Sequence, residues 1–191
     1  SYDHLVEAVG RAIGFVHRRR PDAPLAVLGH SLTSHLTINA RGLDPCLPVG
    51  AIVAFSGGVW LPRWEPSGWF RWRKRATIRL LRWVVSRVGR LPVRRLRLGN
   101  EDESRSYLGQ LAELVLTDRW RSCNGSVDYV EATARCDVPV LGVMAAGDRI
   151  LSRPAAVLGY FDHVGSAAPR RRVTTMLARG RDKGLKRDPD H

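Results

Sequence analysis

The chain has 191 residues, of which 44% are hydrophobic, so it is long enough to bury a core and suits a single domain. It carries 31 basic and 18 acidic residues, and only three of the basic residues are lysines, a bias that favours GC-rich coding over a selected basic function. No run of about 18 uncharged apolar residues is present, so we expect no transmembrane helix.

The first sixty residues alternate between helical and strand patterns. Apolar residues recur at helical spacing over 3–20, where Asp3 is placed to cap the helix. The run 25–28 is apolar without alternation, which is typical of a parallel strand covered on both faces. A second helix over 32–42 and a second strand over 49–55 follow. This order favours right-handed strand–helix–strand units in a parallel sheet.

The composition changes at residue 59. Residues 60–99 contain five of the six tryptophans, and residues 63–97 contain twelve basic residues and one acidic residue, Glu65. Within this stretch 76–88 predicts an amphipathic helix. An acidic turn over 100–103 and helices over 107–120 and 126–133 are predicted next. The remainder predicts a buried strand over 140–146, a helix over 154–164 and a last strand over 171–177.

The cysteines and the ends of the chain give expectations about processing and compartment. Cys46, Cys123 and Cys136 are widely spaced, with no CxxC pair and no zinc-binding spacing. We expect them to be buried free thiols in the cytoplasm, and we expect neither a metal ion nor a cofactor. The chain begins at Ser1 without a signal peptide, and we interpret it as a truncated fragment of a longer protein.

A serine, an aspartate and a histidine each follow a predicted strand. Together these three residue types can support acyl-transfer chemistry. Ser31 lies in Gly29-His30-Ser31-Leu32-Thr33, a strand–turn–helix pattern that exposes one hydroxyl. Asp148 follows the strand over 140–146, and His191 comes after the last strand. The carboxyl ends of parallel strands share one edge of a sheet. A serine hydroxyl needs a base such as histidine, and a carboxylate orients that histidine. Asp137 and His163 are weaker alternatives, since Asp137 precedes its strand and His163 lies near a helix.

These motifs resemble those of the α/β-hydrolase family, in particular a bacterial group of predicted serine esterase-like proteins. The resemblance rests on "PLAVLGHSL" (24–32), "DVPVLGVMAAGD" (137–148) and the terminal "DPDH" (188–191). It implies an α/β fold with a parallel-sheet hydrolase core that lacks its N-terminal strands. On this interpretation 1–59 and 136–191 form the core, and 60–135 forms a helical cap rich in arginine and tryptophan.

The resemblance also implies a function and roles for individual residues. Ser31 would attack a carboxylic ester or related acyl bond, His191 would act as base and then acid, and Asp148 would orient His191. The backbone N–H of Leu32 would stabilise the oxyanion, and its partner donor would come from upstream of residue 1. The sequence departs from the family pattern at Thr33, which replaces a second glycine. Acyl transfer to an acceptor other than water would use the same residues.

The cap segment admits two interpretations. As a lid it would line an apolar acyl pocket for a small-molecule ester through Trp60, Trp64, Trp69 and Trp72. His30, next to Ser31, is a further pocket candidate. Alternatively the chain is a catalytically impaired hydrolase-fold protein whose basic segment binds an anionic membrane surface or a partner. We expect no nucleic-acid ligand, because none of the usual nucleic-acid-binding motifs is present.

Overall fold

The computed structural model describes residues 1–89, 105–150 and 152–178. Its centre is a parallel sheet in the order β1-β2-β3-β4. The strands span Ala26–His30 (β1), Ala51–Phe55 (β2), Val140–Ala145 (β3) and Val173–Ala178 (β4). In register, Val27 pairs with Ile52, Ile52 with Val140, and Val140 with Val173. All three pairings are parallel, so the predicted α/β fold is confirmed.

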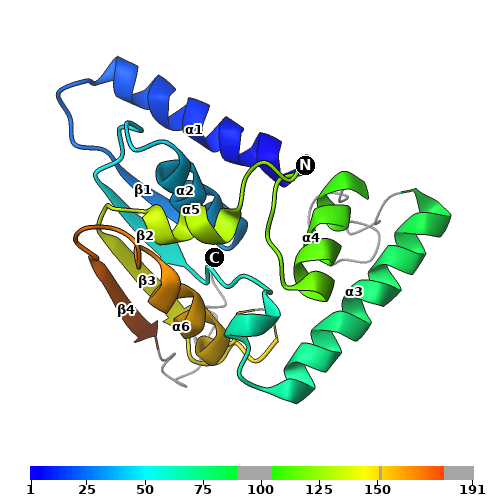
Figure 1. Cartoon of the computed structure of the whole chain (residues 1–191). Coiled ribbons are helices and arrows are strands. Elements are labelled where there is room, and N and C mark those ends of the chain that lie inside the picture. Colours follow the sequence, from blue (N-terminus) through cyan, green and yellow to red (C-terminus); the bar gives the residue numbers. More distant parts are fainter. Residues whose placement is uncertain (90–104, 151, 179–191) are drawn as a thin grey trace, which may run out of the picture.

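The described residues also form six helices and one short turn (Figure 1). The helices are α1 (Tyr2–Arg19), α2 (Leu32–Leu43), α3 (Gly68–Val88), α4 (Arg105–Thr117), α5 (Tyr129–Arg135) and α6 (Pro154–His163), and the 3₁₀ turn η1 spans Pro62–Trp64. The predicted start of α5 at residue 126 was wrong, because Asp128 caps this helix by accepting hydrogen bonds from the N–H groups of Val130 and Glu131. Likewise α3 begins at Gly68, well before the predicted residue 76. The predicted acidic turn over 100–103 lies outside the described residues.

The residue that caps the start of α1 differs from the predicted one. Ser1, not Asp3, is the N-cap residue. The carboxylate of Asp3 accepts hydrogen bonds from Gln110 Nε2 (2.9 Å), Cys123 N (3.0 Å) and Tyr129 Oη (2.7 Å). Burial opposes ionisation of Asp3, but these hydrogen bonds outweigh it and hold the pKa of the carboxyl below its usual value. Asp3 therefore ties the first turn of α1 to α4 and α5.

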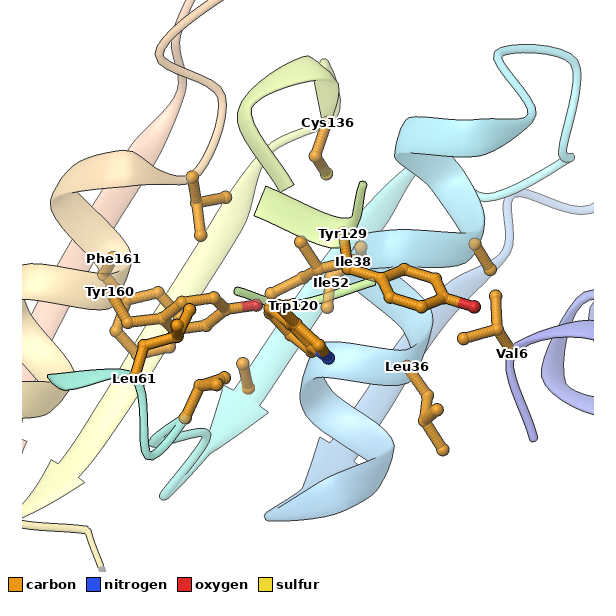
Figure 2. Close-up of a cluster of buried hydrophobic side chains, with 14 of the residues drawn as sticks. Val6, Leu36, Ile38, Ile52, Leu61, Trp120, Tyr129, Cys136, Tyr160 and Phe161 are labelled. Carbon is orange, nitrogen blue, oxygen red and sulfur yellow. The ribbon is translucent and has the colours of Figure 1, made fainter. Parts of the chain in front are cut away.

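The main core lies between the sheet and helices α2, α5 and α6 (Figure 2). Ile38 of α2, Ile52 of β2 and Phe161 of α6 are at most 1% exposed. At Gly42 a Cβ atom would overlap the carbonyl of Ala132, so only glycine lets α2 and α5 approach this closely. Tight contacts of this kind fix where α2 begins, and hence where the turn before it lies.

The opposite face of the sheet is exposed at its edge strands among the described residues: Leu28 of β1 and Met176 of β4 are exposed, whereas Val143 of β3 is buried. Strand residues whose side chains alternate with the core positions, such as Leu28, point to this face. Leu28 is 68% exposed, so the prediction that this strand is covered on both faces was wrong for the described part of the chain. The apolar residues of the first helix do not all face inward, because Leu5 and Val16 are exposed whereas Tyr2 and Val6 are buried.

Helices α3 and α4 pack against each other beside the carboxyl edge of the sheet (Figure 1). A buried ionic cluster attaches α3 to the rest of the molecule. Glu65 accepts from Lys74 Nζ of α3 (3.2 Å) and from Arg153 Nη1, just before α6 (2.6 Å). Burial lowers the pKa of Lys74, and the carboxylate of Glu65 opposes that change. The assignment of 60–135 to a separate cap stays a prediction.

The cysteines lie partly where they were not expected. All three are free thiols, but Cys46 and Cys123 are exposed and only Cys136 is buried. Burial raises the pKa of the Cys136 thiol to about 11. No helix within the described ranges is long and apolar enough to cross a membrane.

Candidate active site

Ser31 lies at the turn between β1 and α2 in an unusual backbone conformation. Its φ and ψ angles are 51° and −116°, a region that costs a non-glycine residue about 1–3 kcal/mol. Its N–H donates to the carbonyl of Phe55 at the end of β2 (2.8 Å). Ser31 is the N-cap residue of α2, yet its side chain makes no capping hydrogen bond. The hydroxyl is therefore not used to stabilise the helix, in contrast to most serines at this position.

The residues around Ser31 hold this turn in place. A Cβ atom at Gly29 would lie 2.7 Å from the backbone nitrogen of Ser34, so the strand and the helix meet too closely for any larger residue. Ser34 is buried, and its hydroxyl donates to the carbonyl of Gly29 (2.9 Å). Thr33, which replaces the second glycine of the motif, is exposed on α2. Its β-branched side chain is therefore accommodated while α2 stays in contact with Gly29.

Asp148 follows β3 and lies on the same edge of the sheet as Ser31. Its carboxylate oxygens accept from the backbone N–H groups of Ile150 and Ser152, each at 3.0 Å. Ser152 Oγ in turn donates to the carbonyl of Ser56, just after β2 (2.9 Å). The turn that carries Asp148 is thus tied to the neighbouring strand. Asp137, the alternative acid, lies before β3 and is paired with Arg41 (2.7 Å).

The candidate base, His191, lies outside the described residues. Among the described histidines, His163 packs against Trp64 and its Nε2 lies 3.0 Å from the carbonyl of Val130. His30 is exposed at the end of β1. His35, one helical turn after Ser31, lines the same cavity as Ser31.

This cavity has a volume of about 210 Å³ and lies between the turn at Ser31 and helix α4. Ser31, Leu32 and His35 line it from the side of α2. As the first residue of α2, Leu32 has a backbone N–H without an intrahelical acceptor. The opposite wall is mostly apolar and consists of Trp60, Tyr107, Leu111, Leu114 and Trp120. A strong hydrogen-bonding group at the base of an apolar cavity is the usual form of a small-molecule site.

The pocket lining differs from the sequence prediction. Of the predicted tryptophans only Trp60 lines the cavity; Trp64 packs against Tyr160 in the core, and Trp69 and Trp72 are exposed on α3. His30 is also absent from the lining. Sequence reasoning missed the wall provided by Tyr107, Leu111 and Leu114. Their spacing at i, i+4 and i+7 was a usable signal, because it places all three on one side of a helix.

Comparison with known proteins adds evidence at the level of the fold. No protein-family model and no curated protein matches the chain. Among solved structures, it is similar to a Paleococcus ferrophilus monoacylglycerol lipase, with a TM-score of 0.54 and 15% identity over 92% of this chain and 65% of that one. It is also similar to mouse alpha/beta hydrolase domain-containing protein 10, with a TM-score of 0.54 and 14% identity over 92% of this chain and 60% of that one.

The chain therefore spans less than two thirds of the length of these two proteins. At such low identity the similarity concerns the arrangement of strands and helices. That arrangement agrees with the four-stranded parallel sheet of this chain. The chain has the fold of the α/β-hydrolases.

Proposed function

We propose that the protein is a serine hydrolase that cleaves a carboxylic ester or a related acyl bond. The conformation of Ser31 is the observation that carries this proposal. Its strained turn is maintained by close packing at Gly29 and by buried hydrogen bonds, and its hydroxyl forms no helix-capping bond. Strain kept at a cavity wall is typical of a group held ready for chemistry.

The proposed reaction follows from the chemistry of the three residues. Ser31 Oγ attacks the substrate carbonyl while His191 takes the hydroxyl proton. The negative charge on the carbonyl oxygen is stabilised by the N–H of Leu32 at the start of α2. When the intermediate collapses, His191 gives the proton to the leaving alcohol, and an acyl-enzyme remains. Water then attacks this ester with His191 again as base, the bond to Ser31 Oγ breaks, and His191 returns the proton to Oγ as the acid leaves. Asp148 keeps the imidazole oriented throughout.

A fluorophosphonate probe tests the nucleophile directly. We expect labelling of the wild-type protein and its loss in Ser31→Ala. A matched control is Ser86→Ala, because Ser86 is exposed on α3 and its hydroxyl only bonds the carbonyl of Trp83 (2.7 Å). Absence of labelling in the wild-type protein, or equal labelling of Ser31→Ala, would overturn the proposal.

The outer side of α3 supports a second function, binding to an anionic membrane surface. Trp69, Trp72, Leu80 and Trp83 share one side of the helix and are 57–62% exposed. The helix contains no acidic residue and seven basic ones: Arg71, Arg73, Lys74, Arg75, Arg79, Arg82 and Arg87.

Exposed tryptophans flanked by arginines are the features of a helix that lies in a bilayer interface. We expect the protein to sediment with vesicles that contain phosphatidylglycerol and to release from them as salt is raised. The double variant Trp69→Ser/Trp72→Ser should bind several-fold more weakly. Arg11→Gln on α1 is the control, because Arg11 is exposed and paired only with Glu7 (3.5 Å). Equal binding of both variants would contradict the surface function.

A further inference from the structure

Most polar side chains in the wall of the cavity are already bonded within the protein. Gln110 bonds Tyr2 and Asp3, Ser152 bonds the carbonyl of Ser56, and Arg121 is paired with Asp128. In the part of the chain that the structure describes, no hydrogen-bond partner is found for Ser31 Oγ or for His35 Nε2. A ligand in this cavity therefore meets two available polar groups on α2.

A chain of hydrogen bonds determines which nitrogen of His35 carries its proton. Thr133 Oγ1 donates to Asn39 Oδ1 (2.9 Å), and Asn39 Nδ2 donates to Tyr2 Oη (2.9 Å). Tyr2 Oη lies 3.0 Å from His35 Nδ1. Since the tyrosine oxygen already accepts from Asn39, its own hydrogen points to Nδ1. The Nδ1 atom is then an acceptor, and the neutral imidazole carries its proton on Nε2.

The surroundings of His35 keep this ring neutral and fixed. Tyr2 stacks on the ring with a centroid distance of 5.7 Å, and Trp120 meets it edge-on at 5.6 Å. Burial lowers the pKa of His35 to about 3. At neutral pH the Nε2 atom thus donates a hydrogen bond and cannot take a proton from Ser31. His35 is therefore unsuited to the role of general base.

His35 and Ser31 are separated by one turn of α2, which is about 6 Å along the helix. We infer that His35 is a binding residue whose Nε2–H holds an uncharged acceptor oxygen of the substrate about one helical turn from the scissile carbonyl. This inference rests on the proposed function, because it defines position relative to Ser31. The substrates inferred in this way are esters whose otherwise apolar chain carries a second oxygen, such as an ether or carbonyl oxygen.

A series of p-nitrophenyl alkanoates tests this inference, with one methylene replaced by an ether oxygen at successive positions. We expect one oxa-ester to exceed the all-carbon ester of equal length in kcat/KM by about three- to tenfold, the effect of one neutral hydrogen bond. His35→Asn retains an acceptor towards Tyr2 but lacks a donor at the Nε2 position, so the preference should disappear. His35→Gln places an N–H close to that position and should retain part of it. The inference fails when no oxa-ester is preferred, or when His35→Asn keeps the preference.

A measurement independent of catalysis separates this inference from the proposed function. The ¹⁵N spectrum of histidine side chains should show His35 in the neutral Nε2–H form at pH 7, and a mixture of tautomers in Tyr2→Phe. The methyl ketone that matches the preferred oxa-ester has no scissile bond. It should shift the Nε2 signal, whereas the all-carbon ketone should not. Equal shifts with both ketones, or an Nδ1–H form in the wild-type protein, would overturn the inference even where Ser31 labels normally.

Discussion

Helix α2 is buried along most of its length, whereas α3 buries only one of its sides. Ile38 and Asn39 in the middle of α2 are completely buried, while Trp72 and Trp83 on α3 are more than half exposed. The position of α2 is set by close backbone contacts at Gly29 and Gly42. The position of α3 depends on a few side chains, among them Lys74 and Ile78. The candidate nucleophile is thus held in place by the core, whereas the residues on the exposed side of α3 are not constrained by core packing.

The largest effect should come from the ionic cluster that attaches α3. Glu65→Gln leaves the ammonium of Lys74 and the guanidinium of Arg153 without their carboxylate in a buried setting. We expect the free energy of unfolding, measured with urea, to fall by about 3–5 kcal/mol. The matched control is Glu7→Gln, which breaks an exposed pair and should change little. Equal effects of the two variants would show that the cluster does not anchor α3.

The next effect concerns the close contact between β1 and α2. In Gly29→Ala the new methyl group would press against the backbone of Ser34, and we expect a loss of about 1–3 kcal/mol in unfolding free energy together with weaker labelling of Ser31. Gly109→Ala in α4 is the control, since a Cβ there meets nothing within 4 Å. That change should stabilise α4 by about 0.5–1 kcal/mol. A tolerated Gly29→Ala would mean that α2 is not held by backbone packing.

His35 on α2 should make stability depend on pH. Its pKa is lowered to about 3 in the folded protein, compared with about 6.5 in the unfolded chain. Between these values the unfolded state binds more protons, so stability falls as pH falls, by up to about 1.4 kcal/mol per pH unit. Urea unfolding at pH 7, 6 and 5 measures this slope. In His35→Gln the slope should be smaller, and an unchanged slope would exclude burial of a neutral His35.

The smallest effect should come from the outer side of α3. Trp83 is 57% exposed, and we expect Trp83→Gln to change the unfolding free energy by no more than about 0.5 kcal/mol. Trp120, which is buried beside Tyr2 and Tyr129, gives the contrast, because Trp120→Ala should cost about 3–5 kcal/mol. Thermal unfolding of both variants measures the difference. Comparable losses would show that α3 is packed on both sides.

Much of the fold was predictable because its signals are local. Apolar runs located β1, β2 and β3, and β4 was predicted over 171–177. The helices predicted over 32–42 and 154–164 lie close to the observed α2 and α6. Ser31 and Asp148 were each expected after a strand, and the structure places them at one edge of the sheet. Their catalytic roles stay predictions, as does that of His191, which lies outside the described residues.

The pocket was less predictable, because composition does not tell which side of a helix faces inward. The tryptophans of α3 were expected to line an acyl pocket, yet Trp69 and Trp72 point to solvent and the wall comes from α4. The periodicity over 76–88 predicted an amphipathic helix, but Trp69 and Trp72 lie before that stretch. The inner side of α3 is set by packing partners such as Leu108 of α4, which contacts Val85.

The order of strands and helices and the glycine–serine turn follow from local sequence, since they depend on residues close together along the chain. The surroundings of Ser31 depend instead on how the helices pack. Tyr2, Asn39 and Thr133 come from three different helices, and their hydrogen bonds make His35 a donor in the same cavity as Ser31. Such a network depends on contacts between distant residues, and no local pattern records it. The chemistry offered to a ligand is therefore a property of the packed molecule.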